Sequence, residues 1–225
     1  MDYIHKEYPK TVGRKEFWKQ IKRTVNDNVV SENDILSIVD QINKYLIFNK
    51  KDHLLDLGCG NAALANYFFT SINKYTGVDF SEYLLGVAKE FFNKDNVSYI
   101  LDEAENFVIK NENSEIYTKI LIYGVAAYLK KNSLINILQK IRKEFKNTKK
   151  IFIGNLPNKY KAQKFYKNRS VKNYDLNDFQ STIGIWWDPD ELKKICNKIG
   201  FRSSIIFMPK NFYGSKYRFD ILLSK

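Results

Sequence analysis

The chain has 225 residues, a length that suits one domain with a sizeable core. Hydrophobic residues make up 44% and aromatic residues 15% of it, which excludes intrinsic disorder, and no apolar run is long enough for a membrane span. With 37 lysines and arginines against 25 aspartates and glutamates the formal net charge is +12, which attracts anions of any kind and selects none of them.

The first 48 residues predict helices that precede the main domain. Residues 1–10 mix charges with tyrosines and contain no apolar segment of the secretory type, so we expect a cytoplasmic protein. Apolar residues recur at helical spacing over residues 15–23 and again over residues 31–48. Ser31 followed three residues later by Asp34 resembles a capping box and predicts the start of the second helix. We divide the chain into an N-terminal helical segment, residues 1–48, and a single folding unit, residues 49–225.

From residue 53 onward, short apolar runs alternate with helical patterns. Strands are predicted at 53–57, 75–78, 97–101, 119–123 and 150–154, and helices from Ala62 and over 83–92, 133–145 and 190–199. Two β-rich runs at 202–208 and 217–223 predict an antiparallel hairpin at one edge of the sheet. The order predicts an α/β fold of the Rossmann-like, doubly wound kind, with a mostly parallel seven-stranded sheet and helices on both faces.

The loop after the first predicted strand has the composition of a ligand-binding turn. In an open parallel sheet, ligands bind at the carboxyl ends of the strands near the switch point. Gly58 and Gly60 lie at that position and let the backbone turn sharply and approach a ligand without a Cβ in the way. Asp79 ends the next strand, where its carboxylate is placed to accept hydrogen bonds from both hydroxyls of an unphosphorylated ribose. We expect its side chain to be exposed when no ligand is bound.

Residues 54–61 (LLDLGCGN) followed by residues 77–81 (GVDFS) resemble motifs I and II of the class I S-adenosylmethionine methyltransferases. The similarity extends over most of the chain and implies S-adenosyl-L-methionine as the cofactor. It further implies that the glycine loop packs against the methionine part, that the acid after the second strand holds the ribose, and that an acid after the third strand meets the adenine. The implied cofactor-binding residues are Asp56, Gly58, Cys59, Gly60, Asp79, Phe80, Asp102, Glu103, Ala104 and Tyr123, with Asp102 preferred over Glu103 for the adenine.

The upstream helix resembles one found in a subset of these enzymes, in which a segment like residues 20–26 (QIKRTVN) folds over the cofactor. The resemblance makes Arg23 and Thr24 candidates for contact with the methionine carboxylate and makes residues 1–48 a predicted lid. The opposing interpretation of Arg23 is a solvated surface charge, which is common in a protein with a net charge of +12.

The loop departs from the family at one position, because Ala62 stands where a third glycine is usual. We expect alanine to be tolerated if this residue has helical φ and ψ. The same stretch also satisfies the dinucleotide fingerprint, Gly58-x-Gly60-x-x-Ala63, followed by Asp79. Four features favour a methyltransferase over a dehydrogenase. They are the acid two residues before Gly58, the helices before the first strand, the terminal hairpin and the lack of a separate substrate domain.

Methyl transfer is an in-line displacement, so the enzyme mainly has to align donor and acceptor. A hydroxyl acceptor benefits from a base, and an amine must be held unprotonated. Tyr128 and His5 are the catalytic candidates: related small-molecule enzymes often have a histidine where Tyr128 stands, and His5 lies in the N-terminal segment. For Tyr128 the alternative is an aromatic that packs at a helix start. His53 lies at the far end of its strand and is expected to be structural, and neither Cys59 nor Cys196 has metal-ligand spacing, so no metal is expected.

The connection from the fifth strand to the last helix is long, polar and basic, as lids and binding loops often are. We expect the acceptor pocket to contain Tyr123, Tyr128, Asn155, Tyr160 and Trp186, and residues 158–180 to become ordered only when the acceptor binds. The cations in this segment, Lys159, Lys161, Lys164, Lys167 and Arg169, favour an anionic acceptor such as a phosphorylated or nucleotide-linked sugar. Trp187 is expected to pack beneath the helix that follows.

These patterns favour transfer of a methyl group from S-adenosylmethionine to oxygen or nitrogen of a small or sugar-containing, anionic acceptor. The family resemblance alone suggests biosynthesis or cell-surface glycan modification. Two alternatives stay open. One is an RNA or DNA methyltransferase, because aromatics interleave with cations over residues 159–169. The other is a nucleotide-binding module without catalysis.

Overall fold

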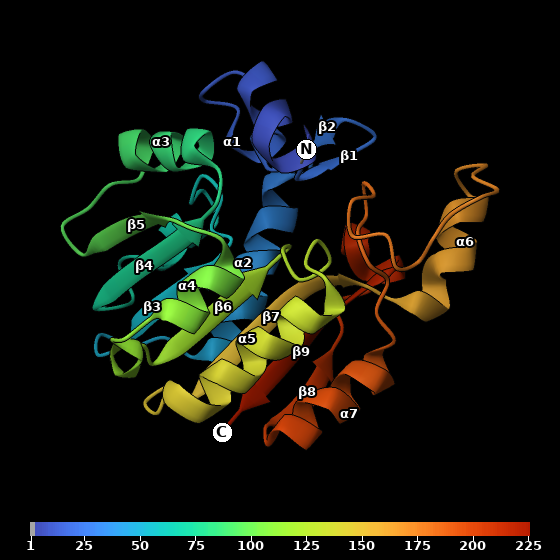
Figure 1. The fold of residues 1–225 in the computed structure, drawn as a ribbon. Coiled ribbons are helices and arrows are strands. Elements are labelled where there is room, and N and C mark those ends of the chain that lie inside the picture. Colours follow the sequence, from blue (N-terminus) through green and yellow to red (C-terminus); the bar gives the residue numbers. More distant parts are fainter. Residues whose placement is uncertain (1–2) are drawn as a thin grey trace.

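Five parallel strands form the centre of the computed structural model, which describes residues 3–225 (Figure 1). They are β3 (His53–Leu57), β4 (Lys74–Asp79), β5 (Val97–Leu101), β6 (Lys119–Tyr123) and β7 (Lys150–Pro157). The antiparallel hairpin of β8 (Arg202–Ile206) and β9 (Arg218–Ser224) completes the sheet in the order β5-β4-β3-β6-β7-β9-β8. The predicted seven-stranded, doubly wound fold with its C-terminal hairpin is confirmed.

Helices cover both faces of the sheet. The helices α2 (Glu32–Leu46) and α3 (Glu82–Phe91) pack on one face, and α4 (Ala104–Lys110), α5 (Lys131–Glu144) and α7 (Pro189–Ile199) pack on the other (Figure 1). Successive side chains of a strand point to opposite faces, so Ile120 and Ile122 contact the α4–α5–α7 layer while Leu121 contacts the α2 layer. This double burial explains why the central strands are nearly continuous apolar runs.

Capping residues set the ends of the helices that flank the sheet. Ser31 accepts the Asp34 N–H at 3.1 Å and begins α2, as predicted. Asp188 accepts the N–H groups of Asp190 and Glu191 at 3.0 and 3.2 Å, and α7 begins at the proline that follows it. Such caps contribute about 0.5–2 kcal/mol each to helix stability.

The N-terminal segment differs from the prediction of a helix over residues 15–23. Within residues 15–23 only one turn, α1 (Phe17–Gln20), is helical, and it is followed by a hairpin of β1 (Thr24–Val25) and β2 (Asn28–Val29). Asn26 and Asp27 between the two strands have φ of 49° and 61°, the positive values that a two-residue hairpin turn requires. No helix among residues 3–225 is long and apolar enough to cross a membrane.

The glycine loop also departs from the prediction, because no α-helix starts at Ala62. This residue has φ of 60°, in the left-handed region, so the condition under which alanine was expected to be tolerated, helical φ and ψ, is not met. The backbone direction set at Ala62 leaves only a short 3-10 turn, Ala65–Phe68, before β4.

The connection at 158–187 contains a helix that sequence periodicity did not predict, α6 (Ala162–Lys167), which projects from the body of the molecule (Figure 1). Phe165 and Tyr166 form an aromatic cluster with Trp186, and Tyr166 stacks on Tyr174 with ring centroids 3.9 Å apart. These contacts join α6 to Tyr174 and Trp186 later in the connection. Trp187 is fully buried in the main core, as expected.

Candidate cofactor and acceptor site

The glycine loop lies at the switch point of the sheet, where β4 flanks one side of β3 and β6 flanks the other. Gly58 and Gly60 have φ of 77° and 56°, which glycine adopts without a Cβ penalty. The N–H groups of Gly58 and Cys59 both donate to the carbonyl of Val78, at 2.7 and 3.1 Å. The loop is thus fixed to the carboxyl end of β4, beside Asp79.

Asp79 is buried, with 6% of its surface exposed, which corrects the expectation of an exposed side chain. Its two carboxylate oxygens accept the N–H groups of Gly60 and Ser81, each at 2.8 Å. The carboxylate therefore joins the glycine loop to Ser81, the N-cap of α3. These bonds hold the carboxylate at the carboxyl end of β4, the position from which the sequence expects it to bind the two ribose hydroxyls.

Asp56 lies beneath the glycine loop in a buried position. The Tyr75 hydroxyl donates to one of its carboxylate oxygens at 2.9 Å. Burial raises the pKa of Asp56 to about 7, and the nearby Asp79 carboxylate adds to this shift. Burial likewise raises the pKa of the Cys59 thiol. The base of the site is accordingly poor in solvent, so charged ligand groups held above it interact strongly with fixed dipoles and charges.

A cavity of about 610 Å³ opens above the loop, within the usual size range of small-molecule sites. It brings together most of the residues that the sequence singled out. Those that line it are His5, Arg23, Thr24, Asp56, Gly58, Cys59, Gly60, Asp79, Phe80, Glu103, Ala104, Tyr123, Tyr128 and Asn155. The glycine turn, the paired acids and the size suit S-adenosylmethionine.

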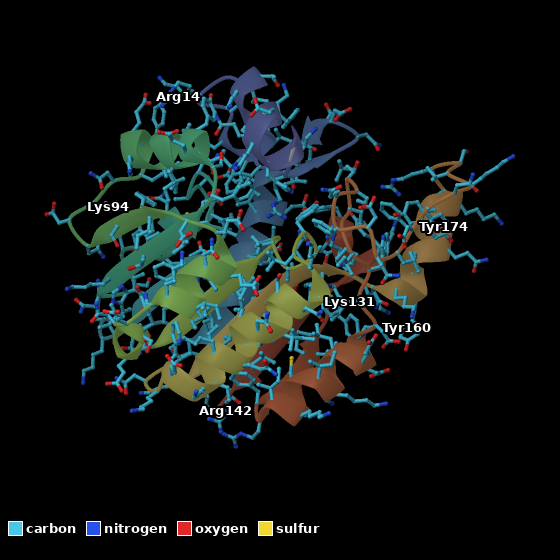
Figure 2. All side chains as sticks on the ribbon, viewed as in Figure 1. Arg14, Lys94, Lys131, Arg142, Tyr160 and Tyr174 are labelled. Carbon is cyan, nitrogen blue, oxygen red and sulfur yellow. The ribbon has the colours of Figure 1, made fainter. Side chains whose placement is uncertain are left out.

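Three predicted site residues do not line the cavity. The Asp102 carboxylate accepts the N–H of Glu103 at 2.8 Å, whereas Glu103 itself faces the cavity, so the geometry favours Glu103 over Asp102. Tyr160 is 63% exposed at the periphery of the molecule (Figure 2), and its hydroxyl donates to Asp188. Trp186 is buried in the α6 cluster and donates to the Tyr166 hydroxyl at 3.1 Å. Neither aromatic lines the cavity.

The N-terminal segment forms one wall of the cavity, through residues 20–27 and His5. The Asn61 carboxamide next to the glycine loop donates to the Phe17 carbonyl and to Gln20 Oε1, at 2.8 and 2.9 Å. Phe17 packs edge-on against Phe91 and Phe92 at the end of α3. The sequence assigned residues 1–48 to one segment, of which residues 1 and 2 lie outside the described residues; the part after Ser31 packs on the sheet as α2.

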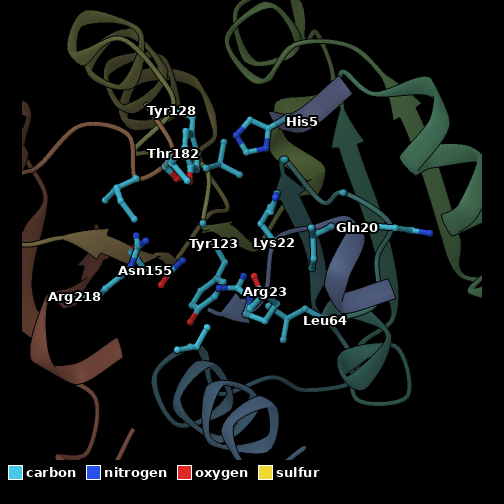
Figure 3. Close-up of a pocket in the computed structure, with 18 of the residues that line it drawn as sticks. His5, Gln20, Lys22, Arg23, Leu64, Tyr123, Tyr128, Asn155, Thr182 and Arg218 are labelled. Atoms are coloured by element: carbon cyan, nitrogen blue, oxygen red, sulfur yellow. The ribbon is translucent and has the colours of Figure 1, made fainter. Parts of the chain in front are cut away.

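Arg23 is buried on this wall. Its guanidinium lies 5.1 Å from the ring centroid of Tyr123 (Figure 3), and only 8% of the residue is exposed. Burial opposes its charge, but the neighbouring Tyr213 and Tyr123 outweigh this and raise the pKa of Arg23. The side chain is therefore a charged group at the cavity, not a solvated surface residue.

The two catalytic candidates meet at the opposite end of the cavity. The rings of His5 and Tyr128 are arranged edge to face, with centroids 4.3 Å apart (Figure 3). The Tyr128 hydroxyl donates to the carbonyl of Thr182 at 2.9 Å, so the residue joins the end of β6 to the segment that follows α6. Sequence patterns did not predict this pairing, since the two residues are 123 positions apart in the chain.

Several cavity residues were not singled out from the sequence. They include Asp27 of the β1–β2 hairpin and the residues that precede or begin β9, Lys216, Tyr217 and Arg218. The Asn26-Asp27 pair between two short β-favouring stretches is a usable hairpin signal. No local signal marks the β9 residues, because they reach the cavity only through the pairing of β9 with β7.

His53 lies away from the cavity, where its Nε2 is 2.8 Å from the Thr76 hydroxyl. Burial, with a smaller effect of Lys74, lowers the pKa of His53 from 6.5 to about 4. The neutral ring thus stabilises the fold above pH 6.5, and this contribution is lost as the pH falls toward 4.

We expect the difference in Tm between the native protein and His53→Gln to shrink over that range. A difference that does not change with pH would show that the ring titrates normally in the fold.

Residues 54–147 match the family model described as a methyltransferase domain. No curated protein matches the chain. Among solved structures, magnesium protoporphyrin IX methyltransferase from Synechocystis PCC 6803 with bound SAH has a TM-score of 0.63 and 15% identity, covering 91% of this chain and 92% of that one. A SAM-dependent methyltransferase from Archaeoglobus fulgidus has a TM-score of 0.58 and 17% identity, covering 85% and 94%. Small RNA methyltransferase HEN1 has a TM-score of 0.65 and 12% identity, covering 86% of this chain and 25% of that one.

Proposed function

We propose that this chain is a class I S-adenosylmethionine-dependent methyltransferase and that it methylates an oxygen or nitrogen of a small, anionic acceptor. The observation that carries the proposal is the division of charge within the cavity. Asp56, Asp79 and Glu103 line the end beside β3, β4 and β5. Cations line the end beside β7 and β9: Lys161, Lys164, Arg169, Lys216 and Arg218. An acceptor that carries negative charge, such as a phosphorylated or nucleotide-linked sugar, suits that end.

In this proposal the carboxylate end holds the cofactor. Asp79 accepts the ribose hydroxyls, Glu103 and Ala104 contact the adenine, and the glycine loop and Arg23 hold the methionine part. When bound, the cofactor supplies an electrophilic methyl group. The contribution of the chain is alignment of the acceptor with that methyl, and such positioning accounts for up to roughly 7–11 kcal/mol of rate enhancement in general.

His5 and Tyr128 are proposed to act on the acceptor side. An imidazole beside the cavity is able to take the proton of a hydroxyl acceptor as the new bond forms, an effect of about 10²–10⁴ in rate. Tyr128, anchored by its bond to the Thr182 carbonyl, orients the acceptor and the His5 ring. These roles predict that both residues affect turnover more than cofactor binding.

A nucleic acid is the second candidate acceptor. Lys159 and Lys167 are exposed outside the cavity on the same segment as the lining cations, and one structural neighbour is a small RNA methyltransferase. Against this, residues 20–27 wall the cavity on one side and leave less access for a polymer. Binding of RNA that falls steeply with salt, and activity on it, would favour this candidate.

The test is methyl transfer from labelled S-adenosylmethionine to a panel of sugar phosphates, nucleotide sugars, their neutral parent sugars and short RNA. We expect a phosphorylated small acceptor to be methylated. His5→Ala should then lower kcat by about 10²-fold or more if it is the base, and Tyr128→Phe by about 2–10-fold, the value of one hydrogen bond. Calorimetry should show unchanged affinity of both variants for S-adenosylhomocysteine (SAH).

Two outcomes would overturn the proposal. Turnover of neutral sugars in preference to their phosphates would contradict the anionic acceptor, and wild-type kcat in both variants would remove the two residues from catalysis. Tight binding of SAH without turnover of any acceptor would favour a binding module without catalysis.

A further inference from the structure

We infer that the cationic end of the cavity is a binding site for a phosphate group, formed chiefly by Arg169 and Arg218 with Lys164 beside them. This inference rests on the proposed function and deepens it, because it names the group by which the acceptor is recognised. It also assigns the site to two segments that are remote in sequence, α6 with the residues after it and the start of β9.

Aromatic contacts bring these segments together. Phe165 of α6 packs against Tyr217 with ring centroids 4.7 Å apart. The Arg169 guanidinium lies 3.7 Å from the centre of the Phe165 ring, and that of Arg218 lies 5.2 Å from the centre of the Tyr217 ring. Each guanidinium group therefore lies over one ring of this aromatic pair, which orients it, and both arginines line the cavity.

Neither arginine forms a salt bridge with a carboxylate among residues 3–225, although Arg218 interacts electrostatically with the buried carboxyl of Asp220, where it opposes the rise in pKa to about 6 that burial causes. Arg169 donates to the Phe165 carbonyl at 3.3 Å, and Arg218 donates to the Asn155 carbonyl at 2.6 Å. Both partners are uncharged main-chain groups, and among residues 3–225 no salt bridge involves either arginine or Lys164. A guanidinium has five N–H donors, so each arginine keeps its charge and several donors for a ligand in the cavity.

The nearest carboxylate on β9, Asp220, is engaged elsewhere. Its two oxygens accept the Asn155 N–H at 2.7 Å and the Gln41 side chain at 2.8 Å, and the residue is fully buried. It contributes no atom to the cavity lining. Asp220 therefore fixes Asn155 next to the site and accepts no hydrogen bond from Arg218.

A β-bulge makes this arrangement possible. The pairing of β7 with β9 shifts between Ile153 and Leu156, and Asn155 within the bulge has φ of 65°. Its N–H and C=O are thereby released from the sheet ladder, and the β9 side chains Asp220 and Arg218 bind them instead. The guanidinium of Arg218 is thus fixed before any ligand arrives, which reduces the ordering cost of binding.

The number of cations favours phosphate over carboxylate. Two oriented guanidinium groups and the ammonium group of Lys164 give more positive charge than one carboxylate balances, while a phosphate carries up to two negative charges and three acceptor oxygens. The N–H donors of a guanidinium group are spaced so that two of them bind two oxygens of one phosphate.

The test is calorimetry of pyrophosphate, inorganic phosphate and acetate titrated into the protein saturated with SAH. We expect pyrophosphate and phosphate to bind more tightly than acetate. Arg169→Gln and Arg218→Gln should each weaken pyrophosphate binding by about 10–100-fold, the value of a charge-assisted hydrogen bond. Lys159→Gln and Lys167→Gln are matched controls, since each removes one charge from the same segment outside the cavity and should leave the affinity unchanged.

Three results would contradict the phosphate site. If Lys159→Gln and Lys167→Gln weakened pyrophosphate binding as much as the arginine variants, the binding would be a general attraction of anions to a basic protein. Equal affinity for acetate and pyrophosphate would be consistent with an anionic acceptor but would contradict the preference for phosphate. No binding of any anion, together with methylation of a neutral acceptor, would overturn the proposed function as well. Arg218→Lys is a control for the possibility that the loss of the bond to Asn155 disturbs the bulge. This variant keeps the positive charge, so it should bind pyrophosphate more tightly than Arg218→Gln.

Discussion

Replacement of Asp79 with alanine is expected to weaken the binding of SAH by about 10²–10⁴-fold, because two charge-assisted hydrogen bonds to the ribose, each worth about 1.5–3 kcal/mol, are lost. The carboxylate also accepts the N–H groups of Gly60 and Ser81 in a buried position. Its removal leaves these two donors without a protein partner, so we expect a further loss of about 1–3 kcal/mol in the free energy of unfolding. Calorimetry and thermal unfolding measure the two effects separately.

The neighbouring acids provide the controls. Asp102→Ala removes a carboxylate that bonds only to the N–H of Glu103 and does not line the cavity, so its affinity for SAH should stay close to that of the native protein. Glu103→Gln should weaken SAH binding if this residue contacts the adenine. An unchanged dissociation constant in a folded Asp79→Ala variant would remove Asp79 from the site, and a larger loss from Asp102→Ala than from Glu103→Gln would restore the preference drawn from the sequence.

The parts of the fold that local patterns predicted are those in which one segment determines its own conformation. Ser31 and Asp34 marked the start of α2 because a cap acts within one turn. The central strands were evident because burial on both faces requires continuous apolar runs.

The sequence predicted less accurately the positions of residues that are held by contacts with distant parts of the chain. Trp186 was expected at the acceptor but is held in the aromatic cluster of α6, and Tyr160 is held outside by Asp188. Arg218 reaches the cavity only because β9 inserts beside β7 with a bulge. Glu103 and Asp102 differ by one position, and the turn after β5 decides which of them faces the cavity.

At Ala62 the family motif predicted the type of loop but not the backbone conformation of the residue. The position that usually holds glycine in the family has φ of 60° here, a value that costs alanine roughly 1 kcal/mol relative to glycine. The chain keeps alanine because its methyl group is fully buried in the α2 layer, where it adds apolar contact. The loop therefore carries strain at Ala62, whereas a Cβ at Gly58 would lie 2.2 Å from Val125 Cγ2.

Replacement of Gly58 with alanine should be the most damaging single change in the loop. A Cβ at this position would lie 2.2 Å from Val125 Cγ2, and φ of 77° is unfavourable for any side chain. Overpacking costs about 1–3 kcal/mol and the left-handed backbone about 1–2 kcal/mol more, so we expect a fall in Tm of roughly 4–20 °C. Because the Gly58 N–H is bonded to Val78, any shift that relieves the clash also moves the loop away from Asp79, and SAH binding should be lost.

The matched control is Gly86→Ala in the helix α3, close in sequence to the same site. No atom lies within 4 Å of a Cβ built at Gly86, and glycine in a helix interior is less stable than alanine by about 0.5–1 kcal/mol. This variant should therefore raise Tm by about 1–4 °C and bind SAH normally. If Gly58→Ala bound SAH as tightly as Gly86→Ala and unfolded at the same temperature, the loop would have to lie farther from Val125 than it does here, and its role as the floor of the cofactor site would be wrong.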